Sequence, residues 1–197
     1  MKERKLKEEY RLETRLDTRT GKPKQIPVYM GDDYHLGGET DRRRLLSDCL
    51  VWLAALMICW FGYLMINSPS SRCIYVLPFA SCASIPMLYA GIGAVNALRA
   101  PRKMTRLQQE TGIARLMRSH LGCAIFLTLA LVGDAVFLLL GGGRAELPGA
   151  ALLALAAAAA WTGFARVKRI CKGITVQPGR AAQEAAKKAA EADTQKE

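Results

Sequence analysis

Several signals of a soluble enzyme are missing from this 197-residue chain, which has only two histidines and no C-x-x-C pair among its six cysteines. No segment has the ligand spacing of a zinc site, the glycine and lysine pattern of a phosphate loop, or the turn that presents a serine nucleophile. We therefore predict no catalytic residue, no metal and no cofactor, and we expect the protein not to be an enzyme. The cysteines form no disulfide framework and are expected to be small buried apolar residues.

Acidic residues are scarce: 17 Asp and Glu stand against 28 Lys and Arg, which gives a formal net charge of +11. In a soluble chain such an excess would suggest a nucleic acid partner. No nucleic-acid-binding motif accompanies it, and the charges are segregated along the chain, so we expect no nucleic acid partner. Basic residues beside the phosphates of a lipid bilayer explain the excess more simply.

Charged residues are almost absent from four long apolar stretches, each of about the 20 residues that a helix needs to cross the ~30 Å hydrocarbon core. A soluble helix keeps one polar face, and these stretches have none. The sequence therefore predicts an all-α membrane protein with four transmembrane helices arranged as two helical hairpins. The predicted spans are residues 45–66, 73–98, 121–140 and 147–165. No signal peptide is expected, because the first apolar run begins late, and the first span is expected to act as an uncleaved anchor.

Two of the spans have further features. Pro78 and Pro86 predict that the second span is bent or tilted, because proline removes a helix hydrogen bond. The second and fourth spans also carry small residues four positions apart, which allow close helix packing. These are the pairs Ala80/Ser84 and Ala90/Ala94, and the stripe Ala150, Ala154, Ala158 and Thr162.

The orientation follows from where the basic residues lie. Of the 28 Lys and Arg, 26 lie in residues 1–44, in the middle loop 99–120 and in the tail 166–197, and two lie in the short links between spans. The positive-inside rule then predicts that both termini and the middle loop are cytoplasmic. We expect a multi-pass protein of the plasma (inner) membrane, and the short outer links fit a bacterial membrane.

The cytoplasmic segments have local patterns of their own. Alternating residues with turn chemistry between them predict a small N-terminal β-hairpin over residues 10–30, followed by a turn over residues 32–35 that leads to the first span. The middle loop reads as a basic amphipathic helix that begins with a capping box at Thr105 and Gln108. Its candidate contacts with anionic lipid headgroups or a protein partner are Arg102, Lys103, Arg106, Arg115 and Arg118. The tail from residue 179 onward is helix-prone.

One acid, Asp134, lies within a predicted span. Intramembrane acids usually face the bundle interior or a water-filled cavity. We predict that Tyr63 and Ser81 lie at a similar depth and hydrogen-bond to it, so these three residues form the candidate intramembrane polar site. Asp134 is either a structural acid or a site that binds a proton or a cation.

Three function classes were weighed against these patterns. The favoured hypothesis is a non-enzymatic scaffold or accessory subunit of a membrane complex, whose small-residue helix faces serve contacts within or between chains. The alternative is a small transporter or channel that works as a homo-oligomer and uses Asp134 as a proton or cation site. A membrane-embedded enzyme would need several convergent polar groups at one depth, and the sequence offers mainly one.

Overall fold

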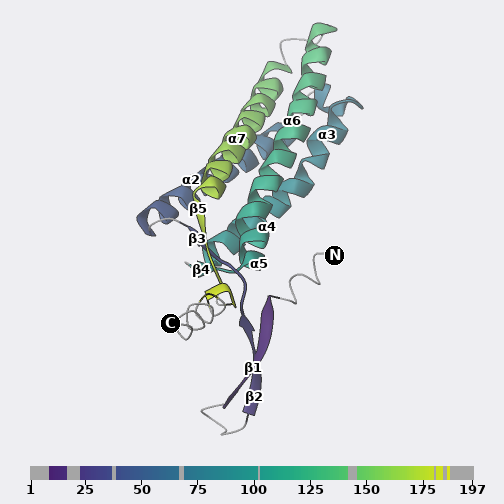
Figure 1. Cartoon of the computed structure of the whole chain (residues 1–197). Coiled ribbons are helices and arrows are strands. Elements are labelled where there is room, and N and C mark those ends of the chain that lie inside the picture. Colours follow the sequence, from purple (N-terminus) through teal and green to yellow (C-terminus); the bar gives the residue numbers. More distant parts are fainter. Residues whose placement is uncertain are drawn as a thin grey trace.

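The computed structural model describes residues 9–16, 23–36, 39–66, 69–101, 103–141, 146–179, 181–183 and 186. Four long helical segments form the body of this part of the chain. These segments are α2 (Glu39–Met65), the pair α3 (Leu77–Cys82) and α4 (Ser84–Arg99), α6 (Arg115–Leu139), and α7 (Leu147–Lys172). Figure 1 shows α7 packed against α2 and α6, with α4 on the other side of α6. By length and composition, all four segments are long and apolar enough to cross a membrane.

In every segment, one continuous series of buried residues alternates spacings of three and four residues. This spacing keeps a single seam of each helix facing its neighbours along the whole bundle. The seam of α2 is Leu46, Cys49, Leu53, Leu56, Trp60 and Tyr63, and that of α3 and α4, with the residue before α3, is Val76, Ala80, Ala83, Met87, Ala90, Ala94 and Ala97. The seam of α6, with the turn before it, is Ile113, Leu116, His120, Cys123, Leu127, Ala130 and Asp134, and that of α7 is Gly149, Leu153, Ala156, Ala160, Gly163, Val167 and Ile170.

The small-residue stripe predicted for the fourth span is wrong. Ala158 is exposed, and Ala150, Ala154 and Thr162 are only partly buried. A strict four-residue step advances about 40° beyond a full helical turn, so such a row winds away from the neighbouring helices. On the second span, Ala90 and Ala94 are buried as predicted.

The second predicted span is divided at Ala83, between α3 and α4. Pro78 lies in the first turn of α3, where its missing N–H costs nothing. Pro86 lies in the first turn of α4 and leaves the carbonyl group of residue 82 without its usual helical donor. A short 3-10 turn, η1 (Ser70–Arg72), precedes this region.

The middle loop does not form the separate amphipathic helix that the sequence suggests. After β4 (Lys103–Met104), α5 (Arg106–Gln109) and the π-helical turn η2 (Glu110–Ala114) run directly into α6, so that Arg106–Leu139 is one helical segment of 34 residues. The capping box of Thr105 and Gln108 is present as predicted. Ile113 and Leu116, two apolar residues of this loop, belong to the buried seam.

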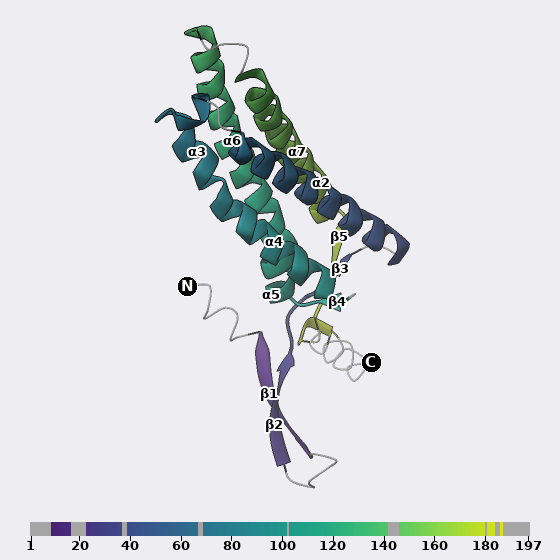
Figure 2. The same ribbon diagram turned by 180° about the vertical axis from the view of Figure 1, so that it is seen from behind.

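The N-terminal β-hairpin is confirmed. Strands β1 (Tyr10–Leu16) and β2 (Pro23–Tyr29) pair antiparallel, with Tyr10 opposite Tyr29 and Leu12 opposite Pro27. Both views in Figures 1 and 2 show the hairpin projecting away from the helices.

A second sheet, which the sequence did not reveal, joins three distant segments. Strand β3 (Asp33–Leu36) lies between β4 and β5 (Ile174–Gln177) and pairs antiparallel with both. Residues 33–36 are therefore a strand rather than the predicted turn. Because β3 precedes α2, β4 precedes α5 and β5 follows α7, the sheet gathers the N-terminal, middle and C-terminal segments at one end of the bundle, which we call the sheet end (Figures 1 and 2).

The close approach of α4 to α6 at Gly93 gives a test of this packing. A Cβ atom on Gly93 would lie 2.9 Å from the backbone nitrogen of Leu116, whereas one on Gly91 would meet nothing within 4 Å. We expect Gly93→Ala to lower the free energy of unfolding by about 1–3 kcal/mol because the backbones must separate. Gly91→Ala should be neutral or stabilising by up to ~1 kcal/mol. Thermal unfolding of the two variants in detergent makes the comparison, and equal effects would contradict this packing.

Candidate functional site

The first candidate site lies at the end of the bundle opposite the sheet, where the end of α2, the end of α6 and the residue before α7 meet. The side chains of Tyr63, Asp134 and Glu146 are 1%, 0% and 3% exposed. Tyr63 lies within electrostatic range of both carboxylates. We call these three residues the acidic cluster.

The hydrogen bonds predicted for Asp134 are not formed. Among the described residues, neither carboxylate oxygen of Asp134 nor the hydroxyl group of Tyr63 has a hydrogen-bond partner. Ser81 is exposed on α3, where its carbonyl oxygen accepts a 2.6 Å hydrogen bond from the Ser84 hydroxyl group. The structure therefore brings Tyr63 to Asp134 and leaves Ser81 outside the acidic cluster.

Glu146 is the member of the acidic cluster that sequence reasoning missed, because an acid before an apolar helix reads as a favourable helix start. Its carboxylate accepts a 3.3 Å hydrogen bond from the backbone N–H of Ser70 in η1. A signal was present: Asp134 and Glu146 are the only acids between residues 111 and 183. Both acids lie near the link of one helical hairpin, so we would expect them to lie close together.

The acidic cluster is suited to holding a proton or a small cation. A buried carboxylate without a hydrogen bond is costly when charged, and binding a proton or a cation removes that cost. Within the described ranges, no three His, Cys, Asp or Glu side chains are grouped so that they could hold a metal ion. The chemistry available here is therefore charge compensation of one or two carboxylates.

A second buried polar group, His120, lies nearer the sheet end on the seam of α6. Its Nδ1 atom lies 3.0 Å from the carbonyl oxygen of Leu116, and its Nε2 atom has no partner among the described residues. The imidazole ring fits only because residue 163 is glycine, since a Cβ atom there would overlap the ring. His120 is thus part of the core.

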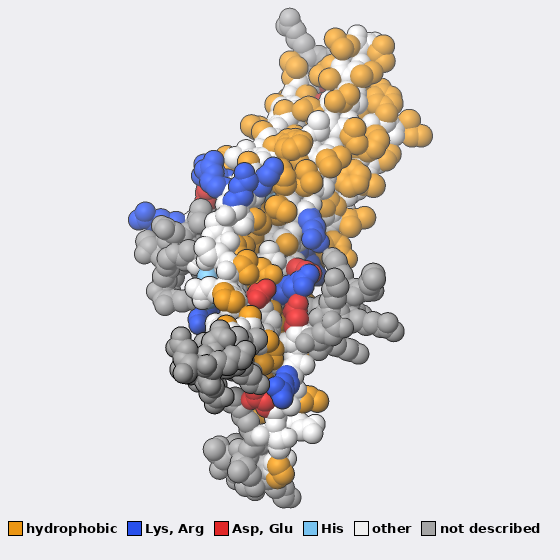
Figure 3. All heavy atoms as spheres, viewed as in Figure 1, with side chains coloured by type: hydrophobic (Ala, Val, Ile, Leu, Met, Phe, Trp, Pro, Cys, Tyr) orange, Lys and Arg blue, Asp and Glu red, His pale blue; other side chains and the backbone are white. Residues whose placement is uncertain are grey.

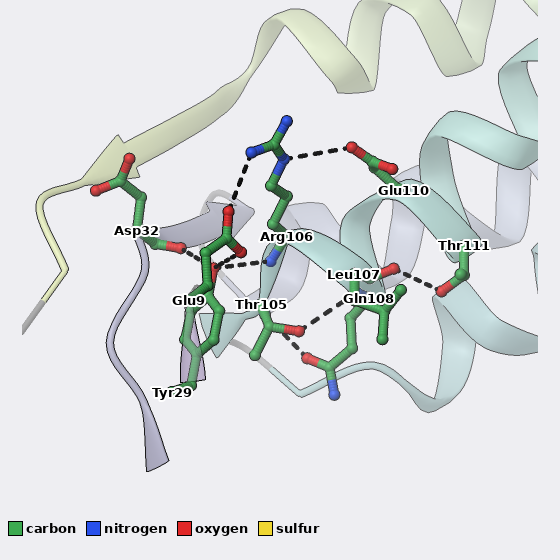
Figure 4. Close-up of polar contacts among 9 residues, drawn as sticks. All are labelled: Glu9, Tyr29, Asp32, Thr105, Arg106, Leu107, Gln108, Glu110 and Thr111. Carbon is green, nitrogen blue, oxygen red and sulfur yellow. Dashed lines mark hydrogen bonds and ion pairs between the residues drawn. The ribbon is translucent and has the colours of Figure 1, made fainter. Parts of the chain in front are cut away.

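The basic residues predicted to contact lipid or a partner have different surroundings, and Arg106 holds the hairpin in place. Figure 4 shows its guanidinium group between Glu9 and Glu110, with N···O distances of 3.0 Å and 3.3 Å. Its backbone N–H donates to the hydroxyl oxygen of Tyr29 at 3.3 Å, and that hydroxyl group lies 3.1 Å from the carbonyl oxygen of Asp32. The hydrogen bond with Glu9 raises the pKa of Arg106, and burial raises the pKa of Tyr29.

Arg115 and Arg118 instead line a groove between α4 and α6 of about 390 Å³. The Arg115 guanidinium carbon lies 5.9 Å from the centre of the Tyr89 ring. Lys103 is exposed on β4, opposite His35, and Arg102 lies outside the described residues. Of the four predicted contact residues that the structure describes, only Arg115 and Arg118 are brought to one groove.

A separate ion pair joins two helices at the same level of the bundle. Asp48 on α2 lies 3.0 Å from the Arg166 guanidinium group on α7. In the sequence, Asp48 follows the arginines that precede the first span, but its partner comes from the last span.

Figure 3 shows how side chains of each kind are distributed over the surface, with apolar side chains over the upper part of the bundle and Lys and Arg below them.

Comparisons with known proteins give no guide to these sites: the chain matches no family model, no curated protein and no solved structure. Function must therefore be argued from the geometry.

The burial of Asp134 predicts the direction in which two substitutions change the free energy of unfolding. Asp134→Leu should raise the free energy of unfolding by about 1–3 kcal/mol, because it removes a buried acid that has no hydrogen-bond partner among the described residues. Asp48→Leu, which breaks a half-exposed ion pair, should lower it by up to ~1 kcal/mol. Thermal unfolding of the full chain in detergent measures both. If Asp134→Leu were the more destabilising variant, the acid would have to be held by a stabilising partner.

Proposed function

We propose that the protein is a four-pass membrane protein of the plasma membrane, and that it acts as a non-enzymatic scaffold or accessory subunit of a membrane complex. Its N-terminal segment, middle connection and C-terminal tail are cytoplasmic in this proposal. The role is to present a small β-structure from a bundle anchored in lipid.

Membrane insertion is supported by the apolar outer surface of the helices. Their outward faces carry large apolar side chains, which water would not solvate favourably. Those with more than half of their surface exposed within the helices are Val51, Ile58, Met65, Ile85, Leu88, Tyr89, Val132, Leu139, Leu147 and Leu155. A bilayer covers such faces without a protein partner.

The common side of the three basic segments is supported by two independent observations. The second sheet ties the N-terminal, middle and C-terminal segments together by backbone hydrogen bonds at the sheet end. The same segments hold 26 of the 28 Lys and Arg. By the positive-inside rule, that side is the cytoplasm.

The apolar face of the β-hairpin is the observation that carries the scaffold role. Tyr10, Leu12, Pro27 and Tyr29 share this face, because their positions are paired across the two strands. Leu12 is 63% exposed. An isolated two-stranded hairpin is marginal in water, and an apolar face projecting from the bundle is stabilised when a partner covers it. The occupant that we propose is a cytoplasmic or membrane protein.

Photo-crosslinking from the two faces of the hairpin tests this role. A benzophenone side chain at position 12 should give one discrete protein adduct in native membranes, because that face is covered. The same side chain at Arg11, on the charged face, is the matched control and should give none. Equal adducts from both positions, or adducts with lipid alone, would contradict a protein partner at the hairpin.

A second candidate function, a small oligomeric transporter or channel, is favoured by one observation. Asp134 is fully buried and lacks a hydrogen-bond partner among the described residues, so it is suited to take up a proton or a cation. Against this, the seam beside it continues through Ala130 and Leu127, which are both fully buried and apolar.

The transporter hypothesis predicts that liposomes containing the protein dissipate a pH or cation gradient. Asp134→Asn should then reduce the flux to that of protein-free liposomes, because the amide cannot exchange a proton or bind a cation as the carboxylate does. Asp48→Asn is the control, since it changes an acid outside the acidic cluster. Unchanged flux in the Asp134 variant would end this alternative.

A further inference from the structure

The groove between α4 and α6 has two kinds of wall. Toward the sheet end it is lined by Arg115 and Arg118, together with the polar groups of the η2 turn. Toward the middle of the bundle it is lined by Ile85, Pro86 and Phe126. A single ligand that fills the groove must therefore be charged at one end and apolar at the other.

The packing of α4 on α6 keeps the groove in place. Gly122 of α6 lies against Pro86, and a Cβ atom there would be 3.1 Å from the Pro86 ring. The helix turn above the groove is fixed by the capping box at Thr105 and Gln108. The groove is thus preformed between two closely packed helices.

The charge of the polar wall is positive. Glu110 also lines the groove, but its carboxylate is paired with the Arg106 guanidinium group at 3.3 Å. The guanidinium carbon of Arg115 lies 5.9 Å from the centre of the Tyr89 ring, and this cation–π contact holds the guanidinium group at the groove. Among the described residues, neither Arg115 nor Arg118 is paired with a carboxylate. Two such guanidinium groups at one rim suit a phosphate group, which arginine binds through several hydrogen bonds.

We propose that this groove binds one anionic phospholipid, with its headgroup phosphate at Arg115 and Arg118 and an acyl chain along Ile85, Pro86 and Phe126. The inference rests on the proposed membrane insertion and is independent of the scaffold role. Of the basic residues predicted to contact lipid or a partner, the proposal assigns Arg115 and Arg118 to one site for one class of lipid. The groove on α7 beside Lys168 and Arg169 is the natural comparison, because it has a similar charge and lies on another face.

Native mass spectrometry of the full chain tests the proposal. The purified protein is mixed with equal amounts of phosphatidylglycerol and phosphatidylcholine, and the ratio of the two bound lipids is measured. The double variant Arg115→Gln with Arg118→Gln should lower this ratio by roughly tenfold, because both charges facing the phosphate are lost. The matched control, Lys168→Gln with Arg169→Gln, removes the same charge from α7 and should leave the ratio within about twofold.

A variant that keeps both arginines covers the case in which the double variant does not fold. Ile85 is 59% exposed and lines the apolar wall, so Ile85→Trp fills the groove from its surface. It should also lower the bound phosphatidylglycerol. Equal losses in the arginine variant and in the α7 control would overturn the proposal in favour of a diffuse basic belt. Displacement of the lipid by glycerol phosphate at the same concentration would overturn it in favour of a phosphate site.

The membrane proposal has a separate readout. Retention of the wild-type chain in membranes after an alkaline carbonate wash reports insertion. If the chain is retained and the lipid ratio does not respond to either groove variant, the lipid site fails alone. If the chain is washed off, the proposed insertion fails first.

Discussion

The alternating spacing of three and four residues between buried side chains is the constraint on which the other features of the molecule depend. It keeps one seam of each helix inward from end to end, and small residues on or next to these seams allow close backbone approach, as at Gly93 beside Leu116. The same geometry determines which polar groups are buried. Asp134 and His120 occupy positions on the α6 seam that apolar residues fill elsewhere, so their burial follows from their register along the helix.

The helix ends then fix the position of the smaller elements. Because β3 leads into α2, β4 leads into α5 and β5 follows α7, three short strands meet at the sheet end although each is far from the others in the chain. Arg106 adds a polar connection between this end and the hairpin, since it contacts Glu9 through its side chain and Tyr29 through its backbone. The projecting hairpin is therefore attached at its base through Tyr29, while Leu12 on its apolar face stays exposed for the proposed partner.

Much of this architecture could be predicted from local patterns. Charge-free stretches indicate the four long helices, alternation over residues 10–30 indicates the hairpin, and Thr105 with Gln108 indicates a helix start. The seam of α7 could not be predicted, because Ala156 to Ala160 are identical residues and give no contrast between faces. Strands β3, β4 and β5 are too short to be recognised alone, since their stability comes from distant partners. The acidic cluster was predicted in part: Asp134 and Tyr63 are brought together, Ser81 lies outside the cluster, and Glu146 was not predicted as a member.

The order of strands in the second sheet has a consequence for how the chain is made. Its central strand, β3, is synthesised before any of the long helices, whereas β5 follows the last of them. During translation, β3 must wait for α7 to emerge before its second edge is covered. The sheet is therefore complete only after α7 has reached its position. A chain truncated before residue 174 would leave the second edge of β3 open to other strands.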